Sequence, residues 1–147
     1  GLTLVVGAPQ ESVPGTGGAD TVVNGAGAAY VFQRPAGAWQ QVGHLTAPSP
    51  VSEEFGWTVA LAGKTVAVGE LAYAVHDGAT YLFAPTADGT WSMRTRFTAS
   101  MARPGFQHSG VDEFGRGIGL SSTTLVVAAP YEYDPQSGIS GTVYAFE

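Results

Sequence analysis

The 147-residue chain contains no cysteine, which excludes disulfide bonds and thiolate-bound metal sites. Charged residues make up only 12% of it, and six Lys and Arg residues stand against twelve Asp and Glu residues, for a formal net charge of −6. Nucleic acids and anionic lipid surfaces are bound by clustered cations. The charge balance therefore argues against both as partners.

Long hydrophobic runs are also missing, so we expect no membrane-inserted segment. We expect no signal peptide in this chain either, because it opens directly on residues 2–6 (LTLVV), a pattern typical of a β-strand. Gly1 stands where an initiator Met would, which predicts a processed product or a fragment. Sustained helical periodicity is absent too, since 21 Gly and 9 Pro interrupt every candidate window. The composition therefore predicts an all-β protein without helices.

What the chain does contain is internal repetition. A Gly-x-x-Tyr-x-Phe hexapeptide occurs three times, each copy preceded by an apolar phrase of the type Leu-Val-Val-Gly-Ala-Pro, and two copies of Phe-Gly are visible. The hexapeptides are 27–32, 78–83 and 141–146; the apolar phrases are 4–9, 66–70 and 125–130; the Phe-Gly pairs are 55–56 and 114–115. Repetition at this period predicts one supersecondary unit that is copied and stacked.

The complete unit is residues 55–113. Its alternation of large and small side chains predicts four strands, at 55–61, 65–68, 79–83 and 91–97. Four strands are the content of a β-propeller blade. The flanking copies are shorter: 1–54 lacks the first strand and 114–147 lacks the last. We therefore expect one propeller segment over 1–147, with about ten antiparallel strands.

A segment of three blades cannot close a ring, because propellers need about four to eight. Two alternatives follow. Either two copies associate as a homodimer that completes the ring, or the chain was cut from a longer propeller. The open faces are expected to carry aromatic packing residues, namely Trp57, Tyr30, Phe32, Tyr144 and Phe146.

The succession of Phe-Gly, Gly-Ala-Pro and Gly-x-x-Tyr-x-Phe resembles the FG-GAP repeat over essentially the whole chain. The second copy departs from it, with Val68-Gly69-Glu70 in place of Gly-Ala-Pro. The resemblance implies an integrin α-like β-propeller of an extracellular or cell-surface protein. Integrin-type calcium loops need carboxylates at positions that here read 62–64 (AGK) and 120–123 (LSST). The chain is therefore more similar to the calcium-free bacterial variety, and we expect no metal site and no cofactor.

Most residues that stand out have a structural interpretation. The hexapeptide aromatics favour packing between blades, and Gly7 and Gly69 favour close backbone approach at strand ends. The acidic pairs 53–54 and 112–113 cannot form catalytic dyads, since neighbours in a strand point to opposite faces; turn chemistry and solubility are the preferred roles. The three histidines lack short metal spacing, and no nucleophile motif accompanies His76-Asp77. We expect no catalytic residues.

Long loops on one rim are the candidates for ligand binding. They join second and third strands, at 10–26 and 131–137, and share that rim with the connections 47–54 and 99–113. Interleaved Tyr and acidic residues there would suit a sugar, a peptide or a cation; a merely solvated loop is the alternative. The candidate ligand-binding residues are Tyr131, Glu132, Tyr133, Asp134, Asp20 and His108.

The sequence thus favours a non-enzymatic recognition or scaffold module that binds an unidentified protein or glycan through its rim loops. Two other functions stay open. One is a calcium-stabilised, lectin-like propeller; the other is a hydrolase with a site on the propeller axis, for which only scattered carboxylates and histidines are available.

Overall fold

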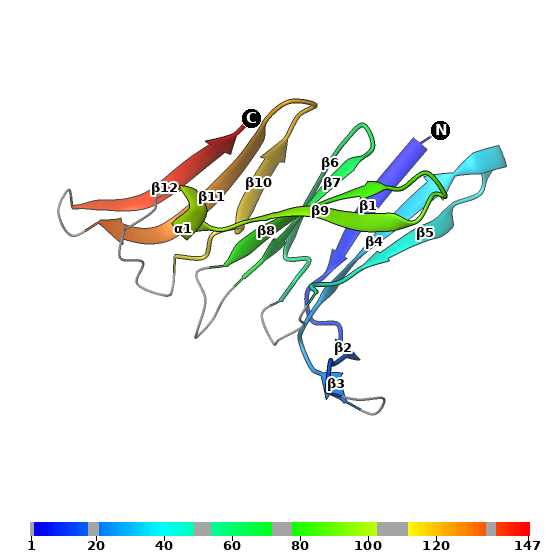
Figure 1. Cartoon of the computed structure of the whole chain (residues 1–147), viewed down its shortest axis with the longest axis horizontal. Helices are drawn as coiled ribbons and strands as arrows, with labels where there is room; N and C mark the ends of the chain where they lie inside the picture. The colour runs from blue at the N-terminus through cyan, green and yellow to red at the C-terminus, as the bar shows by residue number, and fades with distance from the viewer. Residues whose placement is uncertain (1, 18–20, 49–53, 72–77, 103–111, 135–137) are drawn as a thin grey trace.

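The computed structural model describes residues 2–17, 21–48, 54–71, 78–102, 112–134 and 138–147. Its main elements are three antiparallel sheets that lie side by side (Figure 1). Sheet I has the order β1-β4-β5, sheet II the order β6-β7-β8-β9, and sheet III the order β10-β11-β12. The predicted all-β class and the blades of a partial β-propeller are confirmed.

Each strand is followed in its sheet by the next large strand of the chain. The strands of sheet I are β1 (Leu2–Ala8), β4 (Ala28–Arg34) and β5 (Gln40–Leu45). Those of sheet II are β6 (Thr58–Ala62), β7 (Thr65–Glu70), β8 (Ala79–Pro85) and β9 (Trp91–Phe97). Those of sheet III are β10 (Gly117–Leu120), β11 (Leu125–Asp134) and β12 (Ile139–Phe146). This meander needs only short connections, because antiparallel neighbours can be joined by tight turns.

Two hydrophobic cores hold the sheets together, one on each side of sheet II. Between sheets I and II, Phe55 is fully buried, with its ring centroid 5.4 Å from that of Tyr81 and 6.1 Å from that of Phe83. Between sheets II and III, Phe114 takes the same place, 5.5 Å from Tyr144 and 6.3 Å from Phe146. The Phe of each Phe-Gly pair therefore fills the centre of the core between two sheets, because an aromatic ring buries a large apolar area.

The sequence predicted a strand over residues 55–61, but the Phe-Gly pair at its start lies outside the strand. Gly56 has a φ of +93° and its N–H donates to the Gly69 carbonyl, so the chain turns there and β6 begins at Thr58. A Cβ on Gly56 would overlap the Ala28 carbonyl oxygen of sheet I. Glycine is needed because the backbone is left-handed at a point of close approach.

The expectation of no helix is wrong in detail. One α-helical turn, α1 (Ala99–Ala102), follows β9, and a 3₁₀ turn, η1 (Pro35–Gly37), follows β4. A helix of one turn is too short to show a 3.6-residue pattern. The long loop after β1 also contains a small hairpin, β2 (Val13–Pro14) with β3 (Val22–Val23), which projects below sheet I in Figure 1.

The two outer faces of the stack differ from the expected ones. On sheet I, Leu4 pairs with Phe32 and Val6 with Tyr30 in register, and these side chains lie on the face turned away from sheet II. Tyr144 and Phe146 instead point inward against Phe114, so their predicted place on an open face is wrong. The open face of sheet III carries Val126 and Val143, since alternate residues of a strand point to opposite sides.

Candidate functional site

A tyrosine–glutamate pair recurs in all three sheets. The tyrosine of each hexapeptide donates its hydroxyl to a glutamate: Tyr30 to Glu11, in the loop after β1; Tyr81 to Glu70, the last residue of β7; and Tyr144 to Glu132, within β11. Glu11 and Glu132 both stand two residues after the Pro of the apolar phrase. In the divergent second copy, Glu70 is itself the last residue of β7, and it accepts the hydrogen bond of the equivalent tyrosine. The second copy therefore lacks the Gly-Ala-Pro motif but retains the tyrosine–glutamate hydrogen bond.

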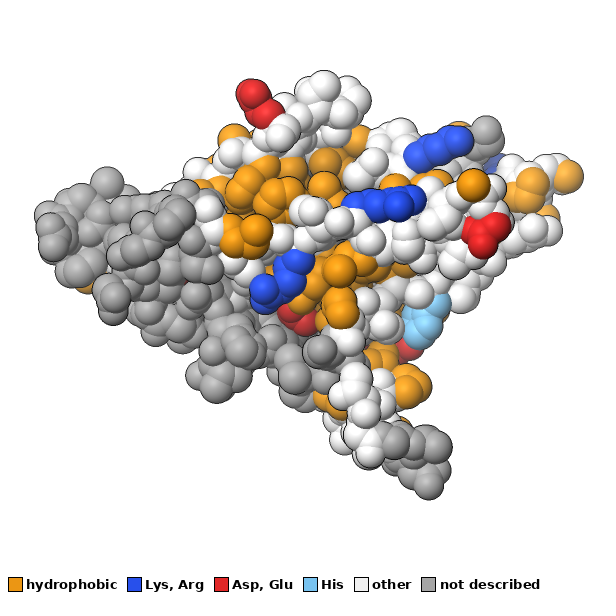
Figure 2. All heavy atoms as spheres, in the orientation of Figure 1, with side chains coloured by type: hydrophobic (Ala, Val, Ile, Leu, Met, Phe, Trp, Pro, Cys, Tyr) orange, Lys and Arg blue, Asp and Glu red, His pale blue; other side chains and the backbone are white. Residues whose placement is uncertain are grey.

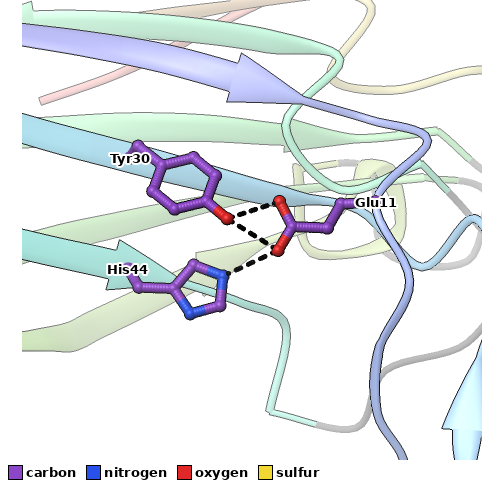
Figure 3. A network of polar contacts seen from close by, with 3 residues as sticks. All are labelled: Glu11, Tyr30 and His44. Atoms are coloured by element: carbon purple, nitrogen blue, oxygen red, sulfur yellow. Dashed lines mark hydrogen bonds and ion pairs between the residues drawn. The ribbon is translucent and has the colours of Figure 1, made fainter.

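The pair of sheet I also includes a histidine, as Figure 3 shows. Both Glu11 carboxylate oxygens lie 2.7 Å from the Tyr30 hydroxyl, and His44 Nε2 lies 3.2 Å from Oε1. The imidazole stacks on the Tyr30 ring with centroids 4.8 Å apart. The hydrogen bond to Glu11 raises the pKa of Tyr30, because the carboxylate favours the protonated phenol.

Sheet II places Arg96 where sheet I has His44. Arg96 pairs with Tyr81 in register, as His44 pairs with Tyr30. Its Nε donates to the Tyr81 hydroxyl at 3.2 Å, and its guanidinium lies 5.7 Å from the ring centroid. Burial raises the pKa of Tyr81 well above its usual value, Glu70 adds to the rise, and Arg96 opposes it.

These networks brace the sheets. Each ties the third strand of a blade to the second strand or to the loop after it. Where the fourth strand is present, a cationic or imidazole side chain on it packs on the tyrosine. The same arrangement at equivalent positions indicates a structural role in the repeat. Glu132, one of the candidate ligand-binding residues, is 1% exposed and accepts the Tyr144 hydrogen bond, so the structure places it inside the molecule.

A second cluster reaches the surface where sheets II and III meet. The Arg116 guanidinium lies between two rings, 5.7 Å from the centroid of Trp57 and 5.5 Å from that of Tyr131. Trp57 is 41% exposed and Tyr131 54% exposed. The distances are those of cation–π contacts. We call this set of three residues the cation–aromatic stack.

The repeat explains how the stack forms. Trp57 and Arg116 each follow a Phe-Gly turn, so packing of consecutive sheets brings the two positions together. The Thr58 hydroxyl donates to the Gly115 carbonyl at 2.6 Å and fixes the two turns to each other. Arg116 is further held by an ion pair with Glu113, whose φ of +51° marks the same left-handed turn position as Glu54. The Arg side chain is therefore positioned before any ligand arrives.

The remaining candidates lie as follows. Tyr133 is on β11, 50% exposed, next to the bulge between Ala129 and Tyr133. Asp134 ends β11, and its side chain lies outside the described part, as do Asp20 and His108. Of the candidates, the structure thus joins Tyr131 to the stack and leaves Tyr133 exposed near it.

Sequence reasoning missed several members of these clusters. Trp57 and Arg116 each stand directly after a Phe-Gly pair. This equivalent position in consecutive repeats was the signal in the sequence that the two side chains could meet. Glu11 and Glu70 were missed because the glutamate stands at a different distance along the chain from each tyrosine, 19 residues before Tyr30 and 11 before Tyr81. Asp112 was expected at a solvated turn but is fully buried. The preferred role of the 112–113 pair in solubility is therefore wrong for Asp112, because the turn packs beneath β11, where the Tyr131 N–H donates to the Asp112 carbonyl.

Among the described residues, no group of three or more His, Asp or Glu side chains could hold a metal ion. Within those same ranges, no helix has the length and apolarity to cross a membrane.

Comparison with known families identifies the repeat. The model of the FG-GAP repeat matches residues 39–83 and 91–146, which is more than half of the chain. No curated protein matches the chain. Both matched segments begin at a tryptophan beside the last strand of one sheet and end in the third strand of the next, at Phe83 in β8 and Phe146 in β12.

Proposed function

Because the chain belongs to the FG-GAP repeat family, we propose that it is a non-enzymatic recognition module that binds a protein or glycan outside the cell or at its surface. FG-GAP repeats generally build binding modules of the propeller type rather than enzymes, and they are typical of extracellular and surface proteins. Function in such folds depends on a local site. The proposal therefore needs a surface that can bind.

The cation–aromatic stack is the observation that supports it. Trp, Tyr and Arg are the residue types most enriched at binding hot spots, because they offer large rigid contact areas together with polar ends. Here all three occur together, partly exposed, with Arg116 held in place by Glu113. A partner would lie against the faces of Trp57 and Tyr131 and accept hydrogen bonds from the guanidinium.

We also propose that the ring is completed beyond these three sheets, by a second copy or by further blades of a longer chain. The support is the pair of apolar outer faces, with Leu4 and Val6 exposed on sheet I and Val143 on sheet III. Such faces are the usual mark of an interaction surface.

The test is a screen of a glycan array and a displayed peptide library, followed by affinity measurements on variants. We expect Tyr131→Ala and Arg116→Ala to weaken binding by about 30-fold each, the effect of losing a hot-spot residue of about 2 kcal/mol. Val22→Ala is the control, because Val22 is an exposed apolar residue on the β2–β3 hairpin, which belongs to neither of the two sheets that form the stack. Ligands whose affinity is the same in all three variants would place recognition elsewhere. Turnover of a hydrolase substrate would contradict the non-enzymatic proposal.

A further inference from the structure

A groove lies between sheet I and two turns of sheet II, on the rim opposite the cation–aromatic stack. Its floor is Thr3 of β1, Gln33 of β4 and Val42 of β5. Its walls are the turn at Gly63 and Lys64, between β6 and β7, and residues 85–91, which join β8 to β9. The stack is at the start of β6, and this groove is at its end. Its volume of about 460 Å³ is that of an ordinary small-molecule site.

Two hollows extend the groove in opposite directions. One of about 400 Å³ shares Val42, Gly89 and Trp91 with it and continues to His44 and Asp88. The other, of about 240 Å³, shares Thr3, Gln33, Gly63 and Lys64 and continues to Leu2 and Arg34. The lining therefore changes along the groove, from cations at one end, past the indole of Trp91, to a carboxylate at the other.

Three polar side chains in the groove are available to a ligand. Thr3 and Gln33 are register partners on neighbouring strands, and Lys64 approaches from the turn of the other sheet. Over the described ranges, none of the three makes a side-chain hydrogen bond or ion pair. Asp88, by contrast, is bonded within its own turn to the Thr86 hydroxyl and the Thr90 N–H, which lowers its pKa and keeps it charged.

Trp91 gives the groove a flat apolar wall. It packs partly against the core between sheets I and II and is half-buried. Gly43 makes room for it, since a Cβ there would lie 2.9 Å from the indole Cδ1. The indole of Trp91 therefore packs against the backbone at Gly43, and the rest of its side chain lines the groove. An aromatic face beside convergent hydrogen-bonding groups suits a pyranose ring, which has apolar faces and hydroxyls at its edge.

We propose that this groove binds an acidic oligosaccharide, with Lys64 pairing to a uronate carboxylate, Gln33 and Thr3 bonding to hydroxyls, and a sugar ring against Trp91. Lys64 is the only lysine in a chain of net charge −6, and the described residues on the face shown in Figure 2 include only a few, separate Lys and Arg side chains. A lysine with no ion pair among the described residues is therefore conspicuous. An extended peptide fits less well. Val42 is the extra residue of a bulge between β4 and β5, which interrupts the regular ladder that a peptide strand would need.

The proposal is tested with trigalacturonate as the acidic probe and maltotriose as the neutral one, by calorimetry at low salt. Reductive ¹³C-methylation gives Lys64 a single side-chain NMR signal. We expect trigalacturonate to bind and to shift that signal, with maltotriose at least tenfold weaker. Lys64→Gln should weaken trigalacturonate binding at least tenfold, whereas Ser122→Glu, which makes the same change in net charge at an exposed residue of sheet III outside the lining, should change it less than twofold.

Three results would overturn the proposal. The first is no binding of trigalacturonate by the unmodified chain. The second is equal weakening by Lys64→Gln and Ser122→Glu, which would mean general charge attraction. The third is equal affinity for maltotriose, which would remove the need for an acid. None of these depends on the stack at the opposite rim, so failure here leaves the proposed function standing.

Discussion

The tyrosine–glutamate pairs show how single residues keep the blades in register. In each pair the glutamate carboxylate is fully or partly buried. Burial of a carboxylate is tolerated only when hydrogen bonds from the protein replace those it would make to water. Glu70 is 4% exposed, and the Tyr81 hydroxyl donates to it at 2.6 Å. In sheets II and III the hexapeptide tyrosine therefore serves twice, with its ring in the core between sheets and its hydroxyl on the glutamate.

At this scale we predict that Tyr81→Phe lowers the free energy of unfolding by about 1–3 kcal/mol, because a buried carboxylate loses a donor while the apolar ring is kept. Guanidinium denaturation measures the change. Tyr133→Phe is the matched control: Tyr133 is exposed and, among the described residues, its hydroxyl makes no side-chain hydrogen bond, so we expect a change below about 0.5 kcal/mol. Equal losses in the two variants would mean that the pair contributes nothing specific.

The strands and their turns set how closely neighbouring sheets approach. Sequence analysis predicted that Gly7 and Gly69 allow backbone contact at strand ends, and this is confirmed. A Cβ on Gly7 would overlap the Gly56 carbonyl oxygen, and one on Gly69 would overlap that of Gly115. Each of these glycines thus receives the Phe-Gly turn of the next sheet, which is why the two motifs occur together.

At the element scale we predict that Gly69→Ala lowers the free energy of unfolding by about 1–3 kcal/mol or more, because the methyl group has no space between Thr58 and Gly115. Thermal or chemical denaturation measures it. Gly119→Ala is the control. Gly119 also lies within a strand, β10 of sheet III, but its new Cβ would lie 3.8 Å from the Val126 side chain, which is an ordinary contact distance. A control as destabilised as the test variant would show that strand propensity, not the close approach, explains the loss.

The whole molecule is assembled by repeats that cross from one sheet to the next. Each segment matched by the family begins beside the last strand of one sheet and supplies three strands of the following one. A single repeat therefore links two sheets covalently, while Phe55 and Phe114 plug the interfaces between them. The same logic leaves sheet I and sheet III each with an outer apolar face.

At this scale we predict that the chain associates through the open face of sheet I. Leu4 is 45% exposed there beside Phe32, and burial of such side chains yields roughly 25 cal/mol per Å². Leu4→Asp should therefore shift the 147-residue chain toward its monomer mass of 15.1 kDa. Light scattering after size exclusion measures this. Met101→Asp, the same change at an exposed residue of α1, should leave the mass unaltered. Identical masses for Leu4→Asp and the unmodified chain would contradict the prediction.

Local pattern was enough to determine the strands and the kind of fold. Residues 91–97 were predicted as a strand and form β9, because alternation of apolar and polar residues is a property of the strand itself. The hexapeptide aromatics were predicted to pack between blades, and Tyr81, Phe83 and Tyr144 do so. The turn at Phe55 was missed because a fully buried aromatic fits a strand pattern equally well.

Only the tertiary structure decided which side chains meet. Tyr30 and Glu11 are 19 residues apart, with a hairpin between them, and Thr58 and Gly115 are 57 apart in different sheets. Trp57, Arg116 and Tyr131 form a stack, and Thr3, Gln33 and Lys64 line one groove, because the sheets pack at a particular depth and offset. That packing is set by glycines at contact points and by buried rings. Apart from the shared position of Trp57 and Arg116 after Phe-Gly, the sequence carries no sign of these contacts.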